Sequence, residues 1–397
     1  MVFPGDSLLK HASPKGLYLH IPFCQVKCHY CNFVITLDQS KNMRERFFAA
    51  LEREAEDARR RFGALQFETF YWGGGTPSLL RPEELERIFS KVRELFRFSK
   101  DPEITIEINP GDVDGEKIAA CRRLGVNRAS VGAQAFQDSL LQKMGRPHSV
   151  EAIERTFELL RGHGFENLSL DLIFRLPGQT LGDFQESLHR ALSLGPSQIT
   201  LYDLEIHDKT KFGMMQKKGE LTLPNEDLHF EMFELAVKTL ESAGYRHYEL
   251  LSFAKPGFES RHNQLYWDNQ EYLGLGPGAF SYMNGVRYQF AADVPQYLKK
   301  CEDSDWTPDT LDVLTEDQKE METLLTGLRL DQGLDLGRIP GLGRELEPGF
   351  RELHEAGLLE RSESRLRLTF KGRALAETVF SFLVSLHADL SAKGRDR

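Results

Sequence analysis

The stretch Cys24-Gln25-Val26-Lys27-Cys28-His29-Tyr30-Cys31 gathers three of the five cysteines of this 397-residue chain. Their spacing is C-x3-C-x2-C, and the other two cysteines, Cys121 and Cys301, are distant in sequence. Three thiolates this close together can ligate three irons of a [4Fe–4S] cluster. The fourth iron then has no protein ligand and is open to a small molecule. The spacing therefore predicts an iron–sulfur centre with an open coordination site.

Other uses of these cysteines stay open at this point. A structural zinc ion takes four ligands, usually in two short pairs, and His20 or His29 would have to complete the set. The three residues would otherwise be unrelated core thiols. A disulfide framework is disfavoured, because five cysteines are few for this length and odd in number. The missing fourth thiol favours the cluster over zinc.

Composition and charge predict a soluble cytoplasmic protein. Hydrophobic residues make up 40% of the chain and charged residues 28%, which is ordinary for a globular protein with a sizeable core. The net charge of -10 argues against a surface for nucleic acid or anionic membrane. No apolar run approaches the roughly 18 residues that a spanning helix needs. The N-terminal residues are too few and too polar for a signal peptide.

Short apolar strands alternate with amphipathic helices from residue 16 to 206, which is typical of β/α units around a parallel sheet. Strands are predicted at Leu17–Phe23, Glu68–Trp72, Ile104–Asn109, Arg128–Gln134, Leu168–Phe174 and Ile199–Ile206, and helices at Lys41–Arg61, Pro82–Leu95, Thr180–Leu194 and Glu226–Ala243. Ile104, Ile106 and Ile108 alternate with polar residues, although a strand between two helical layers would be apolar on both faces. One polar face instead indicates a barrel lumen that holds a polar ligand. The predicted fold is α/β, a partial (β/α)6 barrel.

The chain divides into three predicted parts. Residues 1–15 form a short arm, residues 16–300 form the barrel and include a distinct segment at 244–290, and residues 301–397 form a small α+β domain. In this last domain the order helix, two short strands, helix resembles a winged helix. Its charge is mixed rather than basic, so we expect it to pack against the barrel or a partner and not to bind DNA.

Polar and glycine residues follow the predicted strands, where barrels place their sites. Gly73, Gly74 and Gly75 precede Thr76 at the end of the second strand, which suits a sharp turn or the close approach of a ligand. No Gly-Lys-Ser/Thr follows, so the loop is not a phosphate loop. Further polar candidates are Glu107, Gln134 and Asp171 on successive strands and Arg146 in a loop.

A second group lies in the run His262-Asn263-Gln264-Leu265-Tyr266-Trp267. His262 could supply an axial ligand for a porphyrin, with Tyr266 and Trp267 as its flat walls. The alternative is a structural histidine beside core aromatics, which the chemistry alone favours because histidine has many uses besides metal ligation.

The cysteine run, with Tyr30 before its last cysteine, resembles the hallmark of the radical S-adenosylmethionine (SAM) superfamily. Over almost its whole length the chain resembles the oxygen-independent coproporphyrinogen oxidase family. The resemblance implies that Cys24, Cys28 and Cys31 hold a [4Fe–4S] cluster. It also implies SAM contacts at Tyr18, Gly74, Gly75, Thr76, Glu107, Gln134, Arg146 and Asp171, with Tyr30 beside the adenosyl group.

Three features make the chain similar to the heme chaperones of that family rather than to its oxidases. Phe33 stands where the oxidases have a further cysteine, the arm before the cluster run is short, and the H-N-x-x-Y-W run associated with heme is intact at His262. The resemblance therefore implies a protein that binds heme and transfers it to an acceptor hemoprotein. It leaves room for peripheral contact with a membrane-bound acceptor and for a homodimer.

Two alternatives remain. One is an oxygen-independent coproporphyrinogen III dehydrogenase, which decarboxylates propionates by radical chemistry, and the other is a radical SAM enzyme with an unrelated substrate. One departure from the family pattern is Arg175, where the family has glycine in D-L-I-F-G-L-P-G-Q-T. Its bulk and charge would either crowd a second SAM or meet a propionate.

Overall fold

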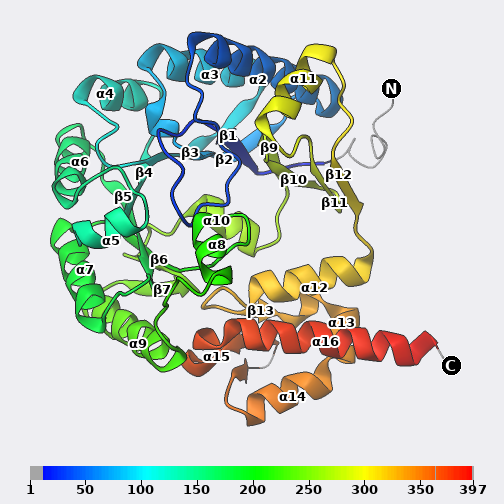
Figure 1. The fold of residues 1–397 in the computed structure, drawn as a ribbon. Coiled ribbons are helices and arrows are strands. Elements are labelled where there is room, and N and C mark those ends of the chain that lie inside the picture. The colour runs from blue at the N-terminus through cyan, green and yellow to red at the C-terminus, as the bar shows by residue number, and fades with distance from the viewer. Residues whose placement is uncertain (1–11, 363, 396–397) are drawn as a thin grey trace.

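A computed structural model describes residues 12–362 and 364–395 and builds them around one large sheet (Figure 1). The strand order is β12-β11-β10-β9-β1-β2-β3-β4-β5-β6-β8-β7. Strands β9 to β6 in this order pair in parallel, and the strands at both edges pair antiparallel. The bounds are β1 Gly16–Ile21, β2 Gln66–Gly74, β3 Arg97–Ile108, β4 Arg128–Gln134, β5 Asn167–Phe174, β6 Gln198–Asp203, β7 Arg246–Glu249, β8 Ser252–Ala254, β9 Tyr272–Leu275, β10 Phe280–Met283, β11 Val286–Gln289 and β12 Thr310–Val313. The predicted α/β partial barrel is confirmed.

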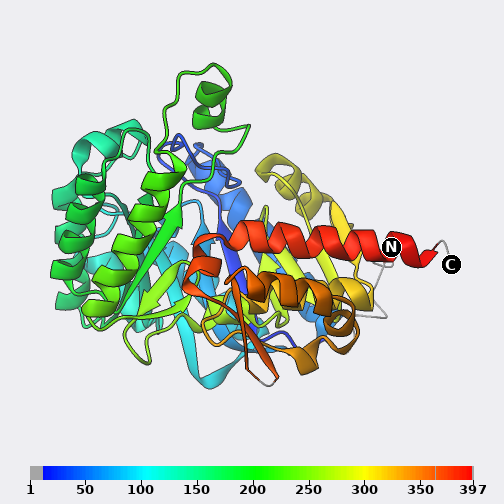
Figure 2. The ribbon, with the colours of Figure 1, turned by 90° about the horizontal axis from the view of Figure 1, so that it is seen from below.

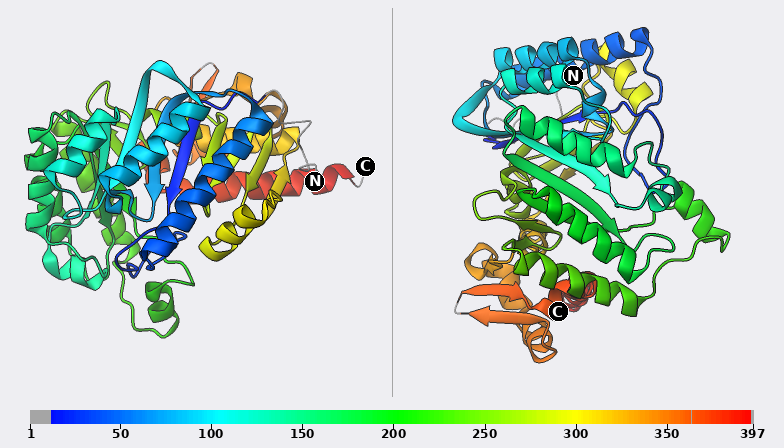
Figure 3. Two further views of the ribbon diagram at one scale, coloured as in Figure 1. Left: turned by 90° about the horizontal axis from the view of Figure 1, so that it is seen from above. Right: turned by 90° about the vertical axis from the view of Figure 1, so that its left-hand side faces the viewer.

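Helices cover the outer face of this sheet, and α8 projects beyond it (Figures 2 and 3). The helices of this unit are α2 Lys41–Phe62, α3 Pro82–Leu95, α4 Gly115–Arg123, α5 Asp138–Lys143, α6 Val150–Gly162, α7 Leu181–Leu194, α8 Lys211–Lys217, α9 Glu226–Ser242, α10 Arg261–Trp267 and α11 Val294–Asp303, with a 3-10 turn η1 at Pro77–Leu79. Local chemistry sets their ends: Thr180 and Asp183 form a capping box at the start of α7, and Gly195 ends it in a left-handed conformation. The predicted bounds of α3 and β4 are confirmed to the residue.

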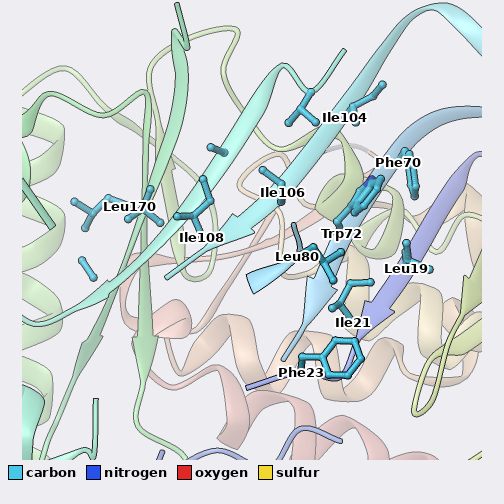
Figure 4. Packing of buried hydrophobic residues seen from close by; sticks show 14 of the residues in the cluster. Leu19, Ile21, Phe23, Phe70, Trp72, Leu80, Ile104, Ile106, Ile108 and Leu170 are labelled. Atoms are coloured by element: carbon cyan, nitrogen blue, oxygen red, sulfur yellow. The ribbon is translucent and has the colours of Figure 1, made fainter. Parts of the chain in front are cut away.

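The core lies between the sheet and the helices, whereas the lumen side of the strands is polar. Ile104, Ile106 and Ile108 are buried, and Figure 4 shows them in one apolar layer with Trp72 and Leu19. The residues between them on β3, Thr105 and Glu107, face the opposite way, because side chains alternate along a strand. Alternation thus leaves polar groups free to build a site inside the barrel.

The C-terminal unit has its own apolar core and a three-stranded sheet of order β13-β15-β14. Its elements are α12 Glu316–Gly327, β13 Leu334–Asp335, η2 Leu336–Arg338, α13 Pro340–Glu345, α14 Glu347–Glu355, β14 Leu359–Ser362, β15 Arg365–Leu368, α15 Phe370–Ala374 and α16 Ala376–Arg395. The predicted helix, hairpin and helix order is confirmed. The predicted final helix is divided at Leu375 into α15 and α16.

The large sheet continues past the predicted boundary between residues 300 and 301. Strand β12 pairs with β11 along four residues and so extends the large sheet to Val313. Four residues in an edge strand give no clear periodicity, which is why the sequence alone missed it. Of the predicted arm, residues 1–11 lie outside the described residues, and Lys15 donates its backbone N–H to the carbonyl of Glu271. No helix in the described part of the chain is both long and apolar enough to cross a membrane.

Candidate functional site

One cavity of about 440 Å3 at the carboxyl ends of the parallel strands brings most of the predicted site residues together. Its volume lies in the range of small-molecule sites. Among the predicted residues, its lining contains Cys24, Cys28, Tyr30, Cys31, Gly74, Gly75, Thr76, Glu107, Gln134, Arg146 and Asp171. Tyr18 and His262 are the two predicted residues that do not line it. Short sequence motifs on six different strands and loops therefore meet at one place.

The three cysteines lie on the loop that follows β1, and the surrounding backbone fixes this loop. Cys24 donates its N–H to the carbonyl of Thr36 at 3.1 Å, and Cys31 closes a turn on the carbonyl of Cys28 at 3.2 Å. All three thiols are free of disulfides. Burial raises the pKa of the Cys24 thiol to about 11 and also raises the pKa of the Cys31 thiol. These two thiols are thus protonated at neutral pH, and metal binding would release their protons.

The two histidines that could complete a zinc site are both engaged elsewhere. The His29 ring bonds the carbonyl of Lys143 at 2.7 Å and the amine of Lys211 at 3.0 Å. The His20 ring contacts the Tyr18 hydroxyl at 3.1 Å and the carbonyl of Val34 at 2.7 Å. In residues 12–362 and 364–395 no three His, Cys, Asp or Glu side chains converge to hold a single metal ion. A cubane cluster requires no such convergence, since each thiolate binds a different iron.

The glycine loop at the end of β2 packs so closely against the residues that lead into the cysteine loop that a side chain there would clash. A Cβ on Gly75 would stand 2.8 Å from the carbonyl oxygen of Phe23 and 2.9 Å from that of Ile21. Gly74 has a φ of +107°, and a Cβ there would stand 2.6 Å from the ring of His20. Only glycine fits at these two positions, and the space it leaves belongs to the cavity wall.

Two carboxyl groups inside the lumen are protonated more readily than usual. Glu107 accepts from the Tyr71 hydroxyl at 2.8 Å and from the Gly74 N–H at 3.2 Å, yet burial raises its pKa to about 7. Asp171 accepts from the Ser130 hydroxyl at 3.1 Å, and burial raises its pKa to about 6. Both groups would gain from a cationic ligand in the cavity, because a nearby positive charge favours the carboxylate form.

This perturbation predicts a pH effect on stability. Unfolded glutamate has a pKa of about 4.3, so between pH 4.3 and 7 folded Glu107 keeps a proton that the unfolded chain has released. The free energy of unfolding therefore falls as pH rises through this window. Glu107→Gln removes the part of this fall that comes from Glu107. We expect the variant to gain on the wild type from pH 5 to 7 and to stay ahead above pH 7. Thermal unfolding of both apoproteins across this range measures the difference, and parallel curves would contradict the assignment.

Arg146 is the only arginine or lysine among the described residues that line the cavity, and it contacts the cysteine loop. Its Nη1 lies 3.6 Å from the Sγ of Cys28, and its Nη2 donates to the carbonyl of Gly132 at 3.0 Å. The cavity wall also carries five carboxylates, which are Glu107, Asp112, Asp171, Asp203 and Glu205. The site therefore favours a cationic ligand over an anionic one.

Tyr18 and Gln134 differ in how they reach the cavity. Tyr18 lies behind the wall, where its ring stacks on Tyr71 with 6.2 Å between centroids. Gln134 lines the cavity and ends β4 in a left-handed conformation, with φ of 68°. Such a φ is uncommon outside glycine and is found at functional sites. Tyr18 thus lies next to Tyr71, whose hydroxyl donates to Glu107 of the cavity wall.

His262 lies at the opposite end of the barrel from the cysteines. Its Nδ1 bonds the hydroxyl of Thr69 at 2.6 Å, its Nε2 bonds the hydroxyl of Tyr266 at 2.8 Å, and its ring stacks on Tyr71. Burial lowers the pKa of His262 to about 3, so the ring is neutral. The Glu103 carboxylate accepts the first N–H groups of α10 and fixes this helix. In this conformation the contacts match the alternative of a structural histidine.

Arg175 does not line the cavity but neutralises part of its wall. It has a φ of 63°, and its Nη1 lies 3.4 Å from Asp203, which also meets His229 at 3.0 Å. The left-handed conformation explains why glycine fits this position well. Neither predicted role, crowding a second SAM or meeting a propionate, is tested by these contacts.

Among the cavity residues that the sequence did not single out, Asn109 has the most direct contacts with predicted ones. Asn109 follows β3 and contacts both Thr76 and Arg146. Its place two residues after Glu107, on the same face of the strand, was the available signal.

Comparison with known proteins agrees with this arrangement. The family model of the radical SAM superfamily matches residues 18–191, and the model of the HemN C-terminal domain matches residues 314–375. The chain is 39% identical to the heme chaperone HemW of Bacillus subtilis, with 92% of this chain and 98% of that protein covered. It is 30% identical to the mitochondrial radical S-adenosyl methionine domain-containing protein 1 of Bos taurus, covering 93% and 87%.

The fold is also that of a solved structure, the coproporphyrinogen III oxidase HemN from Escherichia coli, a radical SAM enzyme. The TM-score is 0.82 at 23% identity, and 95% of this chain and 92% of that chain are covered. Identity this low shows the fold alone. The similarity to HemW at 39% identity over nearly the whole of that protein is the finding that decides the family. The chain therefore belongs to the HemW family of the radical SAM superfamily.

Proposed function

We propose that this protein binds heme and transfers it to an acceptor hemoprotein, on a scaffold that holds a [4Fe–4S] cluster and SAM. The observation that carries the proposal is the likeness to the heme chaperone HemW of Bacillus subtilis, which spans 98% of that protein. Phe33, in place of the further cysteine of the oxidases, supports the same choice.

In this proposal Cys24, Cys28 and Cys31 would hold the [4Fe–4S] cluster, and the open iron would leave room for SAM in the same cavity. The donor set fits, because the three thiols share one cavity wall and Thr76 and Arg146 reach two of them. When bound, the cluster supplies one electron for cleavage of the sulfonium of SAM. The chain itself orients the ligand and keeps it from water.

The charge of the cavity supports the binding of SAM, which the chaperone and the dehydrogenase would share. Five acidic side chains and one guanidinium lie on the wall, and SAM brings a sulfonium and an ammonium to them.

His262 binds heme in this proposal only when α10 moves, because both ring nitrogens are occupied. We expect His262→Ala to weaken heme binding by about tenfold or more, and Tyr266→Phe to strengthen it by freeing Nε2. Heme titration followed by absorbance measures both affinities. If neither variant changes the affinity, His262 is a structural residue and the heme ligand lies elsewhere.

The test of function is anaerobic. The reconstituted protein, with SAM and reductant, is incubated separately with heme and with coproporphyrinogen III. We expect a stable heme complex that passes its heme to an added apo-hemoprotein, and no conversion of the porphyrinogen. Formation of protoporphyrinogen would instead establish the dehydrogenase and overturn the proposal.

A further inference from the structure

Two of the cysteine sulfurs lie within hydrogen-bond distance of donor groups, and the same residue, Asn109, contacts both donors. The Thr76 hydroxyl lies 3.3 Å from the Sγ of Cys24, and the Arg146 Nη1 lies 3.6 Å from the Sγ of Cys28. Asn109 contacts both donors: its Nδ2 donates to the Thr76 oxygen at 3.0 Å, and its Oδ1 accepts from the Arg146 Nη2 at 2.6 Å. One amide group therefore joins the supports of two separate cysteines.

The direction of each hydrogen bond in this series, from Arg146 through Asn109 and Thr76 to Cys24, is fixed by chemistry. A guanidinium can only donate, so the Asn109 oxygen must face Arg146. The Asn109 amide nitrogen then faces Thr76 and donates to its oxygen. The single Thr76 proton is left to point at the Cys24 sulfur. An amide, with one acceptor side and one donor side, keeps both sulfurs supplied with donors, whereas a carboxylate offers acceptors only.

The surroundings hold Asn109 in place. Its backbone N–H donates to the Ser78 hydroxyl at 3.1 Å, and its carbonyl accepts from the Asp112 N–H at 3.3 Å. Lys117 ties the same turn by donating to the carbonyls of Ser78 and Asp112, each at 2.6 Å. The amide is thus preorganised, with little freedom to exchange its two ends.

We propose that Asn109 is a positioning residue that raises the reduction potential of the cluster by orienting the donors to Cys24 and Cys28. This inference rests on the proposed cluster at those cysteines. Hydrogen bonds to the ligand sulfurs and a nearby positive charge stabilise the reduced, more negative state of an iron–sulfur cluster. Asn109 touches no iron in this scheme and acts only through Thr76 and Arg146.

The test replaces Asn109 by aspartate, which has the same shape but two acceptor oxygens. Aspartate keeps the contact with Arg146, but the Thr76 hydroxyl now turns to the new carboxylate and leaves Cys24. The added negative charge also lowers the reduction potential of the cluster. At a fixed solution potential we expect about tenfold less reduced cluster, equivalent to about 59 mV for one electron. An anaerobic redox titration of the reconstituted protein without SAM, followed by electron paramagnetic resonance, gives the midpoint.

Asn127→Asp is the matched control. Asn127 also uses both ends of its amide, accepting from the Ile104 N–H at 2.8 Å and donating to the carbonyl of Pro102 at 2.8 Å. It lies at the other end of the strands, before β4, so its variant should have the wild-type midpoint. An equal shift in both variants would overturn the proposal, because general loosening would then explain it.

Thr76→Val keeps the proposal testable if Asn109→Asp folds poorly. Valine removes the hydroxyl and keeps the shape, so the midpoint should fall in the same direction. In the double variant the midpoint potential should shift by less than the sum of the two single shifts, since both substitutions act in part through one hydroxyl. A wild-type midpoint in Asn109→Asp or Thr76→Val, with full iron content, would overturn the inference. Wild-type protein that takes up no iron would overturn the cluster itself.

Discussion

Replacing Cys28 by serine is expected to leave a folded protein that takes up no iron–sulfur cluster. Cys28 lies on a half-buried loop, and its side chain contacts Arg146, so little of the fold depends on it. A hydroxyl is a poor substitute for a thiolate ligand, and two remaining thiols cannot hold the cube. Iron should fall from about four atoms per chain to near zero, together with the broad visible absorption.

Cys121→Ser is the control for this variant. Cys121 lies in α4 within the apolar core and outside the cavity, so the variant should lose some stability but keep full iron content. Iron and zinc are both assayed after anaerobic reconstitution. A Cys28→Ser protein with wild-type iron absorption would remove the cluster hypothesis. Wild-type protein that holds zinc and no iron would favour the zinc alternative.

The second large effect is expected from Gly75→Ala. The new methyl group would meet backbone atoms of residues 21–23 at 2.8 to 2.9 Å, and backbone cannot step aside as a side chain can. Either the glycine loop or the cysteine loop must move. We expect the free energy of unfolding to drop by about 1–3 kcal/mol. SAM binding to the reconstituted protein should weaken by more than about tenfold, because both loops form its proposed site.

Gly162→Ala separates this clash from the general effect of adding a methyl group. Gly162 ends α6, and a Cβ there meets nothing within 4 Å. Alanine in open helical space should stabilise the protein by about 0.4–1 kcal/mol and leave SAM binding unchanged. Chemical denaturation and calorimetric titration of both variants test the pair. If Gly75→Ala behaved like Gly162→Ala, the close approach of the two loops would be refuted.

Features that depend on nearby residues could be predicted from the sequence. The alternation of Ile104 and Ile106 with polar neighbours reports which face of β3 meets the helices, and this predicted the barrel. The cysteine and glycine runs can likewise be recognised from the spacing of their residues. Because parallel strands end on one side of a sheet, the polar residues near these ends could be expected to share one site, as Glu107 and Asp171 do in the cavity.

Features that depend on contacts across the fold could not be predicted in this way. Asn109 matters because Thr76 and Arg146 reach it from two other segments, and no spacing in the sequence records that. The run around His262 says nothing of which end of the barrel it occupies. That depends on Thr69 and Glu103, far away in the chain, which bind its ring and the start of its helix.

The place of β1 in the sheet limits how the protein can be divided into working fragments. This strand leads into the cysteine loop and lies between β2 and β9, pairing with β9 from Gly16 to Leu19. The superfamily match ends at residue 191, before β9 begins at Tyr272. A fragment cut to that match would leave β1 as a bare edge with unpaired backbone groups, prone to aggregate. The smallest unit suited to separate expression therefore extends through the last strand of the large sheet, at Val313.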